Sequence, residues 1–226
     1  MKQSRISSFI NVMLKEPVLV LIGQSGSSKG TQVTLLLKTC KNLKIKPFTI
    51  ETGELFRTEV NKFSNLNKEK ISEIQNSGKI QSHVHATALW AHELLYNYDS
   101  GPIIFDGSPR SIPEADDMLS FLIKYLGKKV IFIKLNVSDE EAGRRIIERN
   151  NSLISSGKAP RQETDSPEKI VEKLKFFHTH VKPAIDFIQN HQIIEGNVQI
   201  IDIETEQKNK SDVHNDIITA ISNVTL

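Results

Sequence analysis

The stretch VLVLIGQSGSSKGTQ, residues 18–32, is the part of this chain that is most informative about its fold. Its first five residues are branched and apolar, which is typical of a buried β-strand, and apolar residues at helical spacing begin at Thr31. Between them, glycines at 23, 26 and 30 let backbone N–H groups turn inward and, with the next helix N-terminus, form a nest for phosphate oxygens. Lys29 adds a mobile positive charge. The stretch indicates a polyphosphate-binding turn, although a glycine-rich turn with an exposed lysine would share the pattern.

The match to the general phosphate-loop pattern GxxxxGK[ST] is imperfect. Ser28 stands where the second glycine belongs, and Gly30 separates Lys29 from the hydroxyl of Thr31. A residue other than glycine in a strained backbone conformation costs on the order of 1–3 kcal/mol. We therefore expect Ser28 to slow turnover or weaken nucleotide binding without abolishing either.

Short runs of branched apolar residues alternate with helical patterns along the chain. The predicted strands are residues 18–22, 48–51, 102–106, 130–137 and 198–203, and the predicted helices include residues 31–43, 69–75, 112–126 and 169–190. All-apolar strands separated by helices predict an α/β fold with a doubly wound parallel five-stranded sheet and helices on both faces, in a single domain over residues 1–226. In such sheets, ligands bind beyond the carboxyl ends of the strands.

Composition limits the classes of protein that fit. With 226 residues, 38% hydrophobic and 25% charged, the chain has the make-up of a globular protein. The net charge of +2 is too balanced for a general nucleic-acid or membrane-surface partner, so we expect neither. A single cysteine, Cys40, rules out an internal disulfide and a four-cysteine zinc site. We expect no zinc and a cytoplasmic location, since a reducing compartment suits this cysteine usage.

The leader MKQSRISSFINVMLKEP, residues 1–17, is open to two interpretations. Lys2, Arg5 and several serines suggest an organelle-targeting peptide. Glu16 and the direct run into the strand at Val18 favour a short packed helix instead, and this is our prediction.

Several motifs, in the right order, resemble those of the adenylate kinases, within the nucleoside monophosphate kinases. GQSGSSKGTQ (23–32) is similar to the family's loop GxPGxGKGTQ, ETGELFR (51–57) to STGDLLR, and FDGSPRSIPEAD (105–116) to LDGFPRTxxQAE. VSDEEAGRRIIER (137–149) resembles the segment that enters the lid, and TDSPEKIVEKLKFF (164–177) resembles the helix after it. The resemblance covers roughly residues 17–205. It implies a P-loop kinase that reversibly transfers a phosphoryl group from MgATP to AMP, with small nucleotides as partners and a monomer as the default.

Such a reaction brings two polyanions together, so fixed cations are required, and arginine holds two phosphate oxygens at once. The resemblance implies the catalytic group Lys29, Arg110, Arg145, Arg149 and Arg161. The implied ATP-binding residues are Gly23, Gln24, Ser25, Gly26, Ser27, Ser28, Lys29, Gly30, Thr31, Arg145 and Arg149. The implied acceptor-binding residues are Thr52, Gly53, Arg57, Gln81, Gly107, Arg110, Glu114, Arg161 and Lys173. Asp106, at the carboxyl end of a predicted strand, would orient magnesium through water.

Departures from the family pattern leave the substrate open. Glu114 stands where adenylate kinases carry a glutamine that reads the acceptor base. An ionised carboxylate only accepts hydrogen bonds, which suits a base edge with two donors, such as that of guanine, so a kinase for UMP, CMP or GMP is the alternative. Lys173 replaces an expected arginine, and Arg161 lies one residue farther from Asp165 than the pattern predicts. Together with Ser28, these changes also suggest a nucleotide-binding sensor that has lost catalysis.

Two segments of the single domain are expected to move. Residues 52–81 would form the acceptor-binding insert, and residues 150–164 a short lid. The stretch NNSLISSGKAP, residues 150–160, is polar with Gly157 and Pro160 as breakers, and predicts a mobile loop.

Overall fold

The computed structural model describes residues 2–59, 63–76, 82–157, 166–191 and 196–225. One parallel sheet lies at its centre, in the order β2-β3-β1-β4-β5. Its strands are β1 (Val18–Ile22), β2 (Phe48–Glu51), β3 (Ile103–Asp106), β4 (Val130–Asn136) and β5 (Val198–Glu204). The predicted five-stranded parallel sheet is confirmed, with each strand within one residue of its predicted bounds.

The central strand β1 is the point where the connections change direction. Val18 pairs with Ile103 of β3 on one side and with Val130 of β4 on the other, and all five residues of β1 are buried. The chain leaves β1 for β2 at one edge, returns through β3, and then crosses to β4 and β5. Ligands of doubly wound sheets bind beyond the strand ends at such a reversal. The segment after Ile22 therefore occupies the favoured position for a site.

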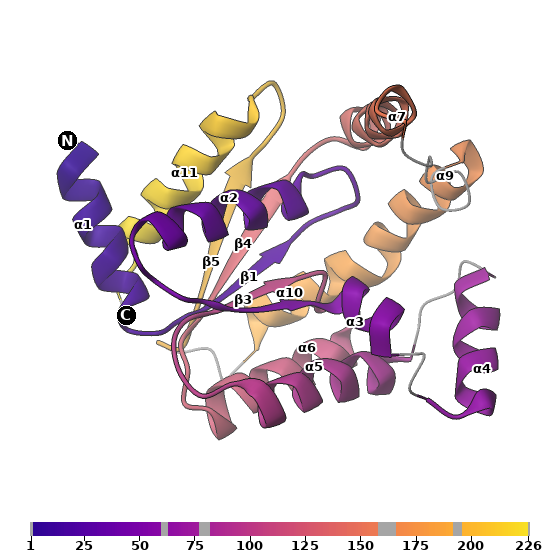
Figure 1. The fold of residues 1–226 in the computed structure, drawn as a ribbon, viewed down its shortest axis with the longest axis horizontal. Helices are drawn as coiled ribbons and strands as arrows, with labels where there is room; N and C mark the ends of the chain where they lie inside the picture. Colours follow the sequence, from indigo (N-terminus) through magenta and orange to yellow (C-terminus); the bar gives the residue numbers. More distant parts are fainter. Residues whose placement is uncertain (1, 60–62, 77–81, 158–165, 192–195, 226) are drawn as a thin grey trace.

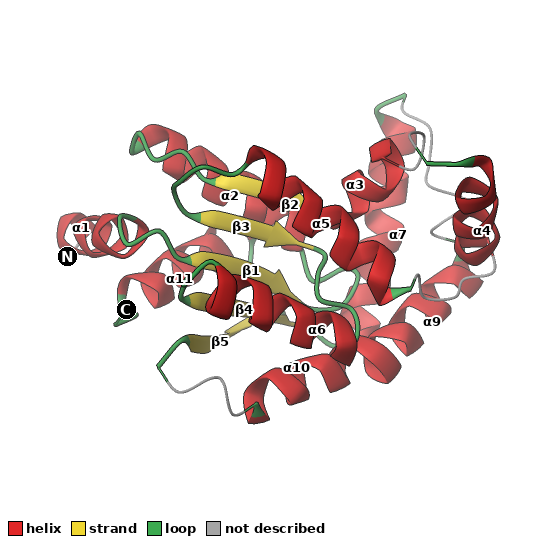
Figure 2. Cartoon of the chain, turned by 90° about the horizontal axis from the view of Figure 1, so that it is seen from below, coloured by secondary structure: helices red, strands yellow, loops and turns green. Residues whose placement is uncertain are grey.

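Helices cover both faces of the sheet (Figures 1 and 2). One face carries α1 (Lys2–Met13), α2 (Lys29–Asn42) and α11 (Lys210–Ser222), and the other carries α5 (His83–Asn97), α6 (Ile112–Leu119) and α10 (Lys182–Asn190). Trp90 of α5 is fully buried and packs edge-to-face on Phe105 of β3, with ring centroids 6.0 Å apart. Phe9 of α1 is equally buried in the opposite core. The leader is therefore a packed helix, as predicted.

Helix α7 (Asp139–Ser155) extends into the stretch that was expected to be a loop. The Ser138 side chain caps it by accepting from the N–H of Glu141, and acidic residues in its first turn favour the positive end of the helix dipole. The ion pair between Glu141 and Arg145 joins successive turns. The prediction of a loop from residue 150 is wrong over residues 150–155, and the helix ends just before Gly157, whose φ is +71°. Residues 158–164 of the expected lid lie outside the described residues.

Two long predicted helices contain wider turns. Residues 169–190 form α9 (Pro167–Phe176), the π-helical η3 (Phe177–Val181) and α10, instead of one continuous α-helix. Residues 112–126 form α6 followed by the π-helical η2 (Ser120–Tyr125). Apolar spacing does not reveal these segments because a single π turn inside a helix leaves most of its buried stripe in place.

Helices α3 (Thr52–Glu59) and α4 (Asn65–Asn76) lie with α7 and α9 at one end of the molecule. Figures 1 and 2 both place this group beyond the carboxyl ends of the strands, where the segment after β1 also lies. Among the described residues, no helix combines the length and the apolar character needed to cross a membrane.

Candidate active site

The loop that joins β1 to α2 is built on glycines that no other residue could replace without a shift of the backbone. Gly23 and Gly26 have φ of +151° and +86°. A Cβ on Gly23 would lie 2.6 Å from the carbonyl oxygen of Leu135, and one on Gly26 would lie 2.5 Å from that of Ala142. The loop therefore packs closely against the end of β4 and the first turns of α7, which fixes its shape.

Lys29 turns back onto this loop. Its Nζ donates to the carbonyl oxygens of Gly23 at 2.7 Å and Gln24 at 2.8 Å. Burial lowers the pKa of Lys29 to about 8, the carboxylate of Asp106 opposes this shift, and the positive charges of Arg110 and Arg149 add to it. These four charged residues, from α2, β3, α7 and the loop after β3, thus influence one another at one place. Three cations and one carboxylate give the site a positive balance, which suits a polyanion.

Ser28 adopts the left-handed backbone conformation that favours glycine. Its φ and ψ are 71° and 17°, and although it precedes α2 its side chain makes no capping hydrogen bond. The backbone at position 28 is therefore strained, as expected from the missing glycine, because a residue with a Cβ is held in a conformation that L-residues disfavour.

Asp106 and Arg110 flank the loop that follows β3. A Cβ on Gly30 would lie 3.5 Å from Oδ2 of Asp106, so this carboxylate faces the first turn of α2. Arg110 donates from Nε to the carbonyl oxygen of Gly107 at 2.6 Å. Burial raises the pKa of Asp106, and the charges of Lys29 and Arg110 oppose this shift. The acid and the arginine are thereby held beside the β1–α2 loop.

Glu114 lies within the protein with both carboxylate oxygens engaged. Glu114 is 2% exposed. Its Oε1 accepts from the Ser108 hydroxyl at 2.5 Å, and its Oε2 accepts from the backbone N–H of Arg110 at 2.7 Å. Burial raises the pKa of Glu114, while hydrogen bonds from Ser108 and the Arg110 backbone and the Arg110 charge oppose the shift. Thr52, expected at the acceptor nucleoside, is fully buried and bonded to Ser108 at 2.8 Å. Sequence reasoning missed Ser108, although its departure from the LDGFPR pattern was a usable signal.

Arg145 is held between α7 and the end of β5. It donates to Glu141 at 2.7 Å and to the carbonyl oxygen of Thr205 at 2.6 Å, and its side chain is 16% exposed. Thr205 is fully buried and nothing in the sequence singled it out. Arg149, one helical turn farther on, belongs to the group around Lys29 through its charge.

The remaining expected residues are less closely gathered. The exposed Arg57 pairs with Glu54 on the same helix, α3, at 2.5 Å. Lys173 lies in the last turn of α9. Arg161 and Gln81 lie outside the described residues. The structure thus brings together Lys29, Asp106, Arg110 and Arg149, and places the other described members on neighbouring elements.

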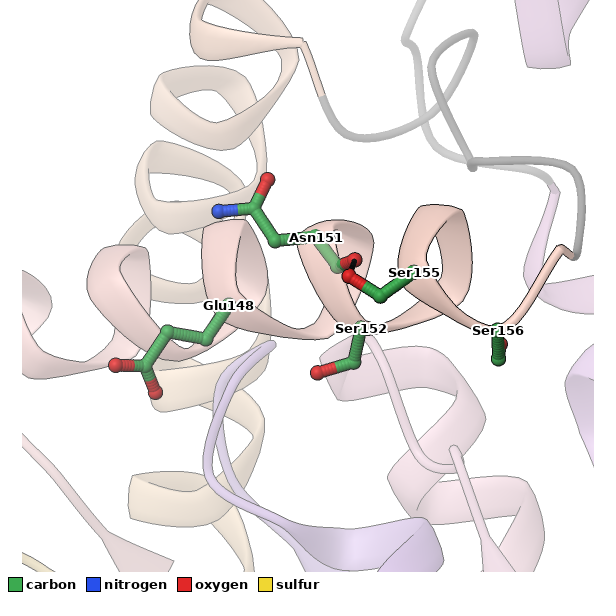
Figure 3. A pocket seen from close by; sticks show the side chains of 5 residues that line it. All are labelled: Glu148, Asn151, Ser152, Ser155 and Ser156. Carbon is green, nitrogen blue, oxygen red and sulfur yellow. Dashed lines mark hydrogen bonds between the residues drawn. The ribbon is translucent and has the colours of Figure 1, made fainter.

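A surface hollow along the second half of α7 is not suited to bind a phosphate (Figure 3). Its lining residues are Glu148, Asn151, Ser152, Ser155 and Ser156. All five come from one helix and its C-cap, and the charged one is an acid, so the hollow offers no cation to a phosphate.

Comparison with known proteins agrees with the geometry of the β1–α2 loop. Residues 21–193 match the family model described as Adenylate kinase. The chain belongs to the adenylate kinase family. Adenylate kinase of Phocaeicola vulgatus is 30% identical over 183 residues, covering 81% of this chain and 88% of that relative. Adenylate kinases of Prochlorococcus marinus (strain NATL1A) and Streptomyces avermitilis are each 29% identical, covering 80% and 78% of this chain and 91% and 87% of those relatives.

Membership of the adenylate kinase family makes this chain a phosphotransferase with a nucleotide-binding P-loop fold. The matched range includes Lys29, Asp106, Arg110 and Arg149, and so contains the whole charged group. Helices α1 and α11 lie outside that range. They cover one face of the sheet and take no part in the charged group.

Proposed function

We propose that this adenylate kinase family member reversibly transfers the γ-phosphoryl group of MgATP to AMP, producing two molecules of ADP. The observation that carries the proposal is the meeting of Lys29, Arg110 and Arg149 with Asp106 beside the glycine loop. In this scheme the loop N–H groups and Lys29 hold the donor phosphates, which replace the carbonyls that Lys29 now contacts. Arg110 and Arg149 neutralise charge on the transferring group.

No general base is needed, because the attacking oxygen belongs to a phosphate that is already ionised. The chain's own residues act by alignment and by excluding water from the site. Lys29 and the arginines act in this scheme as fixed positive charges, and none of them has to transfer a proton. The transfer is reversible because one phosphoanhydride bond is broken as another is formed, and the same cations serve both directions.

Magnesium would enter with the nucleotide. Mg²⁺ commonly binds through one or two carboxylates, substrate phosphates and several waters. Asp106 fits this pattern, since its carboxylate faces the first turn of α2 beside the loop, and we expect it to hold the ion through water. Within the described residues, no group of three or more His, Cys, Asp or Glu could hold a metal on its own. When bound, the ion supplies neutralisation of the phosphate charges.

The expected moving parts are residues 52–81 as acceptor insert and residues 150–164 as lid. Support comes from the placement of α3 and α4 opposite α7 and α9, beyond the carboxyl ends of the strands (Figure 1). Arg57 on α3 and Arg149 on α7 are carried by these two groups of helices.

AMP is favoured over UMP, CMP or GMP as acceptor by the names of the relatives. Glu114 could accept from a guanine base only with a free carboxylate oxygen, and both oxygens have partners inside the protein. Family membership disfavours the alternative of a nucleotide-binding sensor without catalysis, although the backbone of Ser28 is strained.

One set of kinase assays tests these readings. ATP, Mg²⁺ and each of the four monophosphates are supplied side by side, and diphosphate formation is followed. We expect AMP to give the highest kcat/KM, and Lys29→Ala to lower kcat on the order of 100- to 1,000-fold. Lys38→Ala is the matched control, because Lys38 is an exposed lysine on the same helix, α2. AMP as the poorest acceptor would refute the assignment, and ATP binding without any turnover would favour the sensor.

A further inference from the structure

A buried chain of hydrogen bonds links the first residue of α3 and the loop after β3 to α6. Thr52 Oγ1 lies 2.8 Å from Ser108 Oγ, which in turn lies 2.5 Å from Oε1 of Glu114. These three residues are 0%, 1% and 2% exposed. The Ser108 hydroxyl is the donor in the hydrogen bond to Glu114, and it has only one proton to give. Thr52 must therefore donate to Ser108, and the chain has one direction.

The other oxygen of Glu114 holds the backbone of Arg110. Oε2 accepts from the Arg110 N–H at 2.7 Å, while the guanidinium of Arg110 donates to Gly107 at 2.6 Å. One carboxylate thus ties both ends of the short loop between β3 and α6, at Ser108 and at Arg110. Buried carboxylates with such partners hold a single geometry, because a displaced loop would leave polar groups unpaired.

Both residues of the Ser108–Glu114 hydrogen bond differ from the family pattern. In the motif LDGFPRTxxQAE, the positions of Ser108 and Glu114 carry phenylalanine and glutamine. A serine hydroxyl can donate to a carboxylate, whereas a phenylalanine ring cannot. The two exchanged side chains therefore fit each other, and neither exchange needs an altered acceptor base to explain it.

We propose that Glu114 is a positioning residue, which through Ser108 and the Arg110 backbone holds Arg110 beside Asp106 and Lys29, and that it does not read the acceptor base. Thr52, the first residue of α3, supports the same loop from the position just after β2. The inference deepens the proposed function and rests on it for its kinetic readout. A plain helix cap is the competing explanation, because Ser111 and Glu114 have the spacing of a capping box. A cap alone would change stability and leave the rate constants untouched.

The test compares kcat and KM for ATP and four monophosphates in variants of Glu114 and Ser108. Glu114→Met leaves the Arg110 N–H and the Ser108 hydroxyl without their acceptor. We expect it to lower kcat by about 10- to 100-fold, by the same factor for every monophosphate. Ser108→Ala should lower kcat less, again equally for all acceptors. Glu114→Gln should restore most of the rate, because its oxygen can accept from Arg110 while its amide donates to Ser108.

The control removes a different hydrogen bond to the same helix. Thr87 Oγ1 donates to Asp117 of α6 at 2.9 Å, so Thr87→Val perturbs α6 without touching the loop, and wild-type kinetics are expected. A change of about tenfold or more in the preference among monophosphates for Glu114→Gln would overturn the proposal, because that result belongs to a base reader. Wild-type kcat in Glu114→Met would overturn it too.

A spectroscopic readout keeps this inference separate from the proposed function. The amide proton of Arg110 should resonate farther downfield in the wild type than in Glu114→Met, because a charged acceptor strengthens its hydrogen bond. If the wild type turns over no monophosphate, the proposed function fails while this shift still tests the contact. An unchanged Arg110 resonance would show that Glu114 does not hold the loop.

Discussion

Replacing Ser28 by glycine should stabilise this adenylate kinase family member. Ser28 holds a Cβ at φ 71° and makes no capping hydrogen bond that the change would remove. The left-handed conformation destabilises a residue with a Cβ by about 1–2 kcal/mol. Glycine avoids this strain but loses about 0.5–1 kcal/mol of stability, because it loses more conformational entropy on folding. We therefore expect the free energy of unfolding to rise by about 0.5–1 kcal/mol. For a domain of this size, the melting temperature should rise by about 1–4 °C.

The assay is urea unfolding and calorimetry of wild type, Ser28→Gly and Ser28→Ala. Alanine removes the hydroxyl but keeps the Cβ, so it should leave stability close to that of the wild type. Lys44→Gly is a second control: Lys44 is exposed beyond the far end of α2, its φ is 60°, and relief there should raise stability without altering ATP affinity. Ser28→Gly alone should also tighten ATP binding, because Ser28 lies in the loop that we propose to hold the donor phosphates. Equal stabilisation by alanine and glycine, or destabilisation by glycine, would refute the reasoning.

Two further predictions concern charge and packing. The pKa of Lys29 is about 8 when folded and about 10.4 when unfolded, so the unfolded chain binds the proton more tightly between these values. The free energy of unfolding of the wild type should therefore rise from about pH 8 to pH 10 by at most about 1.4 kcal/mol per pH unit more than that of Lys29→Met. The measurement is urea unfolding of both proteins at each pH. The same dependence of the unfolding free energy on pH in both proteins would contradict this prediction. Phe9→Ala should lower the free energy of unfolding by about 3–5 kcal/mol, since Phe9 is fully buried. The ATP affinity of Phe9→Ala should stay unchanged, because α1 lies at the other end of the molecule from α7 and α9 (Figure 1). The control Ile6→Ala should lower the free energy of unfolding much less, because Ile6 is 44% exposed.

Local pattern alone predicted the strands and the loop after β1. A branched apolar run such as residues 18–22, followed directly by glycines, has few other stable arrangements than a buried strand and a tight turn. The same local information failed over residues 150–155, where caps and ion pairs extended α7 through a polar stretch. The π segment at Phe177–Val181 also escaped prediction because it leaves the apolar spacing nearly unchanged.

Motif order indicated which cations matter, but only the folded chain shows which of them meet. Lys29, Arg110 and Arg149 come together because β1 and β3 are neighbours and α7 follows β4 on the other side of β1. Arg145 was expected in the same group, and its contact with Thr205, sixty residues away, could not be read from either segment.

The amino-acid sequence was sufficient to predict the alternation of strands and helices, the phosphate loop and the unfavourable position of Ser28. Tertiary structure alone decided that Glu114 turns inward to Ser108 and Arg110, and that α1 covers the sheet beside α11. The difference lies in how far apart in the sequence the interacting residues are. Backbone preference and apolar spacing depend on near neighbours, whereas a buried hydrogen bond such as that between Thr52 and Ser108, 56 residues apart, exists only once the sheet has placed its strand ends side by side.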